Sequence, residues 1–141
     1  MVISFEIYLK NKRVNKVTLD KELAIGLKKD SEERFNDSLK MKPKYKLENS
    51  YESIRGLIEA LMALDGYKTY SHEAAISYLQ EFKDFSDYDI KQLDIARQKR
   101  NGSKYYGENI EKEYADRTVE ILKPIFMKLT KLLSSKLKSE P

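Results

Sequence analysis

The chain has 141 residues, the length of one domain, and it contains no cysteine and a single histidine. This composition excludes a disulfide framework and a thiolate or histidine-rich metal centre, so we expect no metal ion and no cofactor. Lysine and arginine outnumber aspartate and glutamate by 27 to 23, a small excess that permits an anionic partner without indicating a protein that coats nucleic acid.

No stretch approaches the roughly 20 apolar residues that a membrane span needs. The chain begins MVISFEIYLKNKRV, in which the charges follow a short apolar run, unlike the order in a signal peptide. We therefore expect a cytoplasmic protein that makes no membrane contact.

Helical patterns dominate the chain, and strand signals are nearly absent. Residues 1–17 are expected to form an arm or a short helix. Thr18 is a candidate N-cap for a longer helix that should end before Pro43, because a residue that precedes proline avoids helical geometry. The expected apolar face of this helix comprises Leu19, Leu23, Leu27 and Phe35.

Two further helices follow. The first is expected to run from a cap at Asn49 or Ser50 to Gly66, a residue type that commonly ends helices. The second is shorter and is capped by Ser71. Their expected buried residues are Tyr51, Ile54, Ile58 and Leu61 in the first helix, and Ala75, Ile76 and Leu79 in the second.

The last two helices carry the clearest spacing. One is expected to begin at Ser86 or Asp87 and to stop near Gly102, and the other to begin near Asn109. The apolar stripe of the last helix comprises Val119, Leu122, Phe126, Leu129 and Leu133.

The end of the chain, residues 134–141, is polar and is expected to fray. No internal repeat is visible. Together the patterns predict a single all-α domain over residues 1–141, an up-and-down bundle of about five helices.

The most informative stretch is DIARQKRNGSKYYG, residues 94–107. At helical spacing, Arg97 and Arg100 continue the face of Ile90 and Leu93, so two cations extend a core stripe. Buried arginines need partners, and we therefore expect this pair to emerge at a groove, a bundle end or a subunit interface.

Asn101 and Gly102 predict an end to that helix, which leaves Lys104, Tyr105 and Tyr106 in the connection to the last helix. A structural interpretation is that the cations stabilise the helix dipole and both tyrosines pack on the bundle. A functional interpretation is that the stretch binds a ligand that carries phosphate.

A family resemblance bears on this choice. The segment YESIRGLIEALMALDGYKTYSHEAAISYL, followed by the helix that runs into ARQKRNGSKYYG, resembles the HEPN family of small helical-bundle proteins, over most of residues 18–130. The resemblance implies a HEPN-like bundle with a site formed across a homodimer. It also implies a family activity of metal-independent RNA cleavage. In many members it further implies a minimal nucleotidyltransferase as the partner in a toxin–antitoxin pair.

Active members of the family carry R-N-x-x-x-H in this turn, and the resemblance assigns the arginine to Arg100 and the asparagine to Asn101, with Tyr105 in place of the histidine. Metal-free cleavage needs a base, an acid and a cation at the phosphate. Histidine can serve as acid or base near pH 7, whereas an ordinary tyrosine, with a pKa of about 10, is ionised in roughly one molecule per thousand. These residues therefore suit binding better than cleavage.

Three residues outside this stretch are also candidates. His72 follows the helix cap Ser71, where a neutral structural imidazole is expected, and it can supply the missing base only if the fold brings it to Arg100. Glu52 and Arg55 lie three residues apart on one helix, a spacing typical of a surface ion pair, and they are also candidate supporting residues of the site.

The sequence thus favours a HEPN-like protein that binds RNA or a nucleotide, with weak or no catalytic activity. Arg100 would hold a phosphate, Asn101 would shape the turn and contact the ligand, and Tyr105 would hydrogen-bond or stack. The expected binding residues around them are Arg97, Lys104, Tyr106, Arg55 and Glu52. Two alternatives stay open: a metal-independent ribonuclease toxin that uses Arg100 with Tyr105 in the histidine position, and a structural dimeric adaptor.

Overall fold

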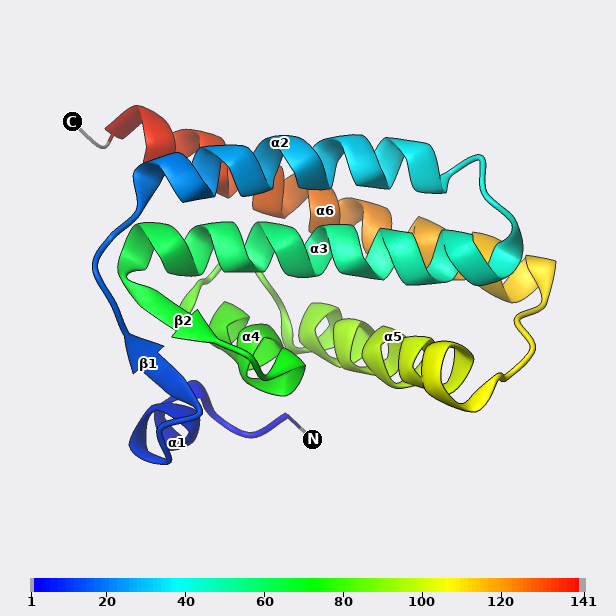
Figure 1. Cartoon of the computed structure of the whole chain (residues 1–141), viewed down its shortest axis with the longest axis horizontal. Coiled ribbons are helices and arrows are strands. Elements are labelled where there is room, and N and C mark those ends of the chain that lie inside the picture. Colours follow the sequence, from blue (N-terminus) through cyan, green and yellow to red (C-terminus); the bar gives the residue numbers. More distant parts are fainter. Residues whose placement is uncertain (1, 140–141) are drawn as a thin grey trace.

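The computed structural model describes residues 2–139, which form a helical bundle with one small sheet (Figure 1). The helices are α1 (Phe5–Lys10), α2 (Lys21–Ser38), α3 (Pro43–Asp65), α4 (His72–Tyr78), α5 (Asp87–Tyr106) and α6 (Lys112–Ser139). The other elements are β1 (Val14–Lys16), β2 (Tyr67–Thr69) and the 3₁₀ turn η1 (Leu79–Glu81). The predicted all-α bundle is confirmed, with α1 as a short helix in the N-terminal arm. Within the described residues, no helix is both long and apolar enough to cross a membrane.

Helix α3 lies at the centre of the bundle. It packs against α2, α6, α5 and α4, and Figure 1 shows α2 along one side of it and α5 along the other. Its buried residues do not form a single stripe, because apolar side chains occupy consecutive positions from Ala60 to Leu64. A helix that is apolar on most faces must be enclosed by neighbours, and this requirement explains its central position.

Helix α3 begins earlier than predicted. Pro43 occupies its first turn, where the N–H that proline lacks would have no helical partner. The expected caps, Asn49 and Ser50, lie inside the helix, and the Ser50 hydroxyl donates to the Leu47 carbonyl at 3.1 Å. The predicted end is confirmed, since Gly66 adopts the left-handed conformation with φ 84°.

The N-cap of α2 is Asp20 rather than Thr18. Its Oδ1 accepts a hydrogen bond from the Leu23 amide at 3.0 Å, which satisfies one of the free donors at the helix start. The helix ends at Ser38, before Pro43, as predicted.

The buried face of α2 differs from the predicted leucine face. Leu19 and Leu23 are 61% and 50% exposed, and among the predicted face residues Phe35 alone is buried. A side chain on Gly56 of α3 would collide with the Ser31 hydroxyl, so the two helices approach closely where their side chains are small. The buried residues of α2 are Ala24, Ser31, Phe35 and Ser38.

The predicted stripe of α6 is confirmed. Phe126 stacks on Phe35 of α2 with ring centroids 4.1 Å apart, and the other four stripe residues are buried. The helix begins at Lys112 rather than near Asn109, and it continues to Ser139. Most of the tail that was expected to fray is therefore helical, and its last two residues lie outside the described part of the chain.

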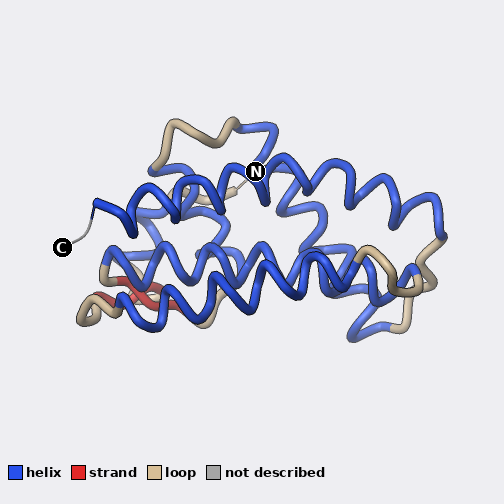
Figure 2. The backbone as a smooth tube through the Cα atoms, turned by 90° about the horizontal axis from the view of Figure 1, so that it is seen from above, coloured by secondary structure: helices blue, strands red, loops and turns tan. Residues whose placement is uncertain are grey.

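The sheet pairs β1 with β2 in antiparallel register, with Val14 opposite Thr69 and Lys16 opposite Tyr67 (Figure 2). Neither strand was predicted, because three residues are too few to show alternation. The pairing holds the N-terminal arm against the connection between α3 and α4.

Candidate functional site

Helix α5 extends past its predicted end. Asn101 and Gly102 lie inside the helix, and Gly107 ends it with φ 67°. Gly102 is buried beneath Glu108, whose carboxylate would collide with any side chain there, and the Glu108 amide donates to the Gly102 carbonyl at 3.1 Å. Gly102 therefore lies in a close approach to the Glu108 side chain rather than in a turn. As a consequence, residues 104–106 lie on the last helical turn rather than in the connection to α6.

Arg100 is 4% exposed and is held within its own chain. Its Nη2 lies 2.6 Å from Oε1 of Glu52 on α3, and its Nη1 donates to Oδ1 of Asn101 at 3.1 Å. The guanidinium also lies over the rings of Tyr51 and Tyr105, 5.9 and 5.6 Å from their centroids. The prediction that Arg100 emerges at a groove or interface is wrong, because these partners allow it to be buried.

The contact between Arg100 and Glu52 is close but poorly directed. Arg100 Nε and Glu52 Oε1 are buried, and neither makes a hydrogen bond to a described residue, although Oε1 lies 2.6 Å from Nη2. We interpret the contact as an ion pair without aligned N–H···O geometry. A buried pair with unsatisfied groups contributes little stability as a whole, yet removal of either partner is costly.

The two other arginines nearby are also paired. Arg97 Nε donates to Asp94 at 2.9 Å, and Arg55 Nη2 lies 2.8 Å from Glu59 Oε1. We call Arg55, Arg97 and Arg100 the arginine cluster. Its ion-pair partners are Glu52, Glu59, Glu73 and Asp94. Three cations against four carboxylates leave one net negative charge, so the cluster does not attract anions strongly. Within residues 2–139 no group of histidine, aspartate and glutamate side chains is arranged to hold a metal ion.

His72 is the first residue of α4 and lies beside the arginine cluster. Its Nδ1 is 3.1 Å from the Tyr51 hydroxyl, and its ring stacks on the Tyr51 ring at a centroid distance of 5.9 Å. Burial lowers the pKa of His72 to about 4; Arg55, Arg100 and Arg97 act in the same direction and Glu52 opposes them. The imidazole is therefore neutral near pH 7, as predicted. The fold also brings it into the same neighbourhood as Arg100.

Tyr51 is the site residue that sequence reasoning missed. It falls on the apolar stripe of α3 and is 1% exposed, so it was expected only as a core residue. In the structure its ring contacts both Arg100 and His72. Burial raises the pKa of its hydroxyl, which therefore stays protonated. The one available signal was that a buried tyrosine hydroxyl needs a polar partner.

The end of α5 carries an exposed surface formed by Lys104, Tyr105 and Tyr106, which we call the α5-end surface. The two tyrosines are 62% and 80% exposed, and Lys104 Nζ lies 5.5 Å from the Tyr105 ring centroid. Among residues 2–139, no carboxylate lies within ion-pair distance of Lys104. The structural interpretation, in which both tyrosines pack on the bundle, is wrong. The exposed Tyr105 ring thus has the Lys104 ammonium and the buried Arg100 guanidinium over it.

Comparisons of the chain with protein-family models, with curated proteins and with solved structures find no match. The HEPN resemblance therefore stays a prediction from the sequence, and the function has to be argued from the geometry of the α5-end surface and the arginine cluster.

Proposed function

We propose that the protein binds single-stranded RNA or a nucleotide at the α5-end surface and does not cleave it. The observation that carries the proposal is the Tyr105 ring, which is 62% exposed and has the Lys104 ammonium and the Arg100 guanidinium over it, 5.5 and 5.6 Å from its centroid. Any of the nucleobases can stack on such a ring, and each stacked base contributes about 1–3 kcal/mol to binding.

The two cations have different roles in this proposal. Lys104 is exposed and unpaired within the described residues, so its ammonium is available to a phosphate next to the stacked base. Arg100 is held by Glu52 and Asn101, and its guanidinium lies over the Tyr105 ring. This assignment replaces the expectation that Arg100 itself holds the phosphate, since it would first have to leave Glu52.

The chemistry available near Tyr105 argues against cleavage. RNA cleavage without metal requires a base and an acid at the reacting oxygens. His72 has a pKa of about 4 and cannot act as the acid near pH 7, and its Nδ1 is engaged by the Tyr51 hydroxyl. The carboxylates that surround the arginine cluster would repel a phosphate that approached it.

One observation favours a ribonuclease as the second candidate. His72 and Arg100 both contact the ring of Tyr51, so a base and a cation lie in one neighbourhood. A substrate that drew Arg100 away from Glu52 would place a phosphate near a neutral imidazole. Cleavage of this kind would depend on His72 and Arg100, and not on the hydroxyl of Tyr105.

The resemblance adds two proposals of its own: a homodimer, and a minimal nucleotidyltransferase as the partner. Their support is the sequence pattern alone. Sedimentation equilibrium of the full chain tests the first proposal, and co-purification with a co-expressed minimal nucleotidyltransferase tests the second.

The test of the proposed function is a titration of a fluorescently labelled single-stranded oligoribonucleotide, followed by anisotropy in buffer without divalent metal. Tyr105→Ala should weaken binding about tenfold, and Tyr105→Phe, which keeps the ring, should bind like the wild type. Tyr88→Ala is the matched control, since Tyr88 is 60% exposed at the start of α5. Lys104→Gln should weaken binding and reduce its salt dependence.

The same samples run on a denaturing gel separate the alternatives. Intact RNA supports binding without cleavage. Cleavage that is lost in both His72→Asn and Arg100→Ala would overturn the proposal in favour of the ribonuclease. If no RNA or nucleotide binds and Arg100→Ala changes only the oligomeric state, the structural adaptor is favoured.

A further inference from the structure

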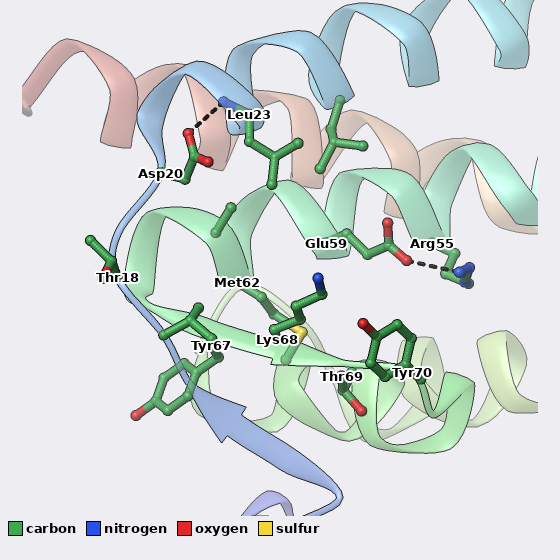
Figure 3. Close-up of a pocket in the computed structure, with 13 residues that line it drawn as sticks. Thr18, Asp20, Leu23, Arg55, Glu59, Met62, Tyr67, Lys68, Thr69 and Tyr70 are labelled. Carbon is green, nitrogen blue, oxygen red and sulfur yellow. Dashed lines mark hydrogen bonds and ion pairs between the residues drawn. The ribbon is translucent and has the colours of Figure 1, made fainter.

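A pocket lies away from the α5-end surface, between the start of α2, the second half of α3 and β2 (Figure 3). Its volume is about 600 Å³, within the range of roughly 300–1,000 Å³ that is typical of small-molecule sites, and it is open to solvent. Its apolar wall is formed by Val17, Leu23, Leu27, Met62 and Ala63. The opposite end is polar and contains Arg55, Glu59, Lys68 and Tyr70.

The charged side chains that line the cavity differ in whether they have a polar partner within the chain. Asp20 caps α2 through the Leu23 amide, and Glu59 is paired with Arg55 at 2.8 Å. Lys68 on β2 is different: its ammonium lies over the Tyr70 ring, 5.3 Å from the centroid. No carboxylate of the described residues lies within ion-pair distance of it. In Figure 3 the Lys68 ammonium points from β2 toward α3, into the space beside the Arg55–Glu59 pair. Lys68 acts on Glu59 only at longer range, so among the described lining residues it is the cation without an ion pair.

The polar end is also partly shielded from water. Burial raises the pKa of Glu59, and this effect exceeds the opposing influence of the adjacent Arg55. This shielding applies to Glu59 and Arg55, whereas Lys68 and Tyr70 at the same end are exposed.

We propose that this cavity binds a small amphipathic carboxylate. The aliphatic part of the ligand packs on the wall that contains Leu23, Leu27 and Met62, and its carboxylate pairs with Lys68. The site shares no residue with the α5-end surface, so carboxylate binding can be tested independently of RNA binding.

The test compares three ligands that share one alkyl chain: dodecanoate, dodecanol and dodecyltrimethylammonium. Each is titrated below its aggregation threshold into the full chain, and heat is measured. Dodecanoate should bind with one molecule per chain, about tenfold more tightly than the other two, because it alone forms a charge-assisted contact with Lys68. Lys68→Gln should remove this preference and leave dodecanol binding unchanged. Leu23→Gln should weaken the binding of all three.

Matched controls come from a separate hollow that Lys91 and Ile95 line on α5. Lys91→Gln and Ile95→Gln should leave dodecanoate binding as in the wild type. Lys68 and Leu23 are exposed, so their substitutions leave the core intact, and thermal melts of both variants verify this.

Three results would overturn the proposal: equal affinity for the three head groups, binding unaffected by both Lys68→Gln and Leu23→Gln, or loss of binding as the chain self-associates. The last result would assign the hollow to an interface with a second copy of the chain.

Discussion

Protonation of His72 should make the protein less stable in mild acid. The pKa of this histidine is lowered to about 4 in the folded chain, against about 6.5 in an unfolded one. Between these two values the unfolded chain binds more protons than the folded chain. The free energy of unfolding must therefore fall as the pH drops from about 6.5 to about 4, and it is fully retained above pH 6.5.

The size of this effect follows from the two pKa values. A tenfold change in proton affinity is worth about 1.4 kcal/mol, which sets an upper limit of about 3 kcal/mol. Because His72 is only partly buried, solvent screening reduces the expected loss to about 1–2 kcal/mol. The loss arises because a protonated His72 would be a partly desolvated cation close to Arg55, Arg100 and Arg97.

Urea denaturation at pH 7 and pH 4.5, for the wild type and His72→Asn, measures the effect. The asparagine oxygen can take the place of Nδ1 as a partner for the Tyr51 hydroxyl, but it does not titrate. Other groups titrate alike in both proteins, so the wild type should lose about 1–2 kcal/mol more than the variant between the two pH values. Equal losses would refute the account of His72 as a buried neutral group beside the arginine cluster.

Three further predictions concern stability, each checked by urea denaturation at pH 7. Glu52→Gln should lower the free energy of unfolding by about 2–3 kcal/mol, because it leaves the Arg100 guanidinium buried without its carboxylate. In the double variant, Arg100→Met should recover part of that loss, and additive losses would contradict this explanation. Gly26→Ala should stabilise the protein by about 0.5–1 kcal/mol, because Gly26 lies within α2 and a side chain there meets only open space. Gly107→Ala should destabilise it by about 1 kcal/mol, because Gly107 has a φ of 67°. Effects of the same sign would argue against these local conformations. Phe35→Ala should cost about 3–5 kcal/mol by leaving a cavity at the α2–α6 contact, and a loss below about 1 kcal/mol would show that this contact is not packed as described.

Helix positions could be predicted where local chemistry decides them. Ser71 and Ser86 cap α4 and α5 as expected, because serine hydroxyls accept hydrogen bonds from backbone amides at the helix start. Gly66 ends α3 because glycine readily adopts the left-handed conformation. The stripe of α6 was predicted in full, since its spacing is regular and its opposite face is charged.

The errors arise where tertiary contacts override local preference. Leucines on α2 suggested a packed face, yet the buried face uses small residues such as Ala24 and Ser31 that allow close approach to α3. Asn101 and Gly102 suggested a helix end, but the helix continues for about one more turn to Gly107, and the Glu108 amide donates to the Gly102 carbonyl. Neither contact has a signal in the local sequence.

The candidate site shows the same division. Helical phase placed Arg97 and Arg100 on the core-facing side of α5, and the structure confirms that placement. Phase is consistent with the Asp94–Arg97 pair on α5, but it could not reveal Glu52 and Glu73, because these carboxylates come from other helices. The exposure of Tyr105 likewise depends on where α5 ends, which is a property of the whole fold.

The central claim is that Tyr105 binds a nucleobase by stacking. The most direct measurement is the ratio of dissociation constants for one labelled single-stranded oligoribonucleotide between Tyr105→Ala and Tyr88→Ala, two truncations of similarly exposed tyrosines on the same helix. The account predicts binding about tenfold weaker for Tyr105→Ala, with Tyr88→Ala equal to the wild type. Equal dissociation constants for the two variants would contradict it.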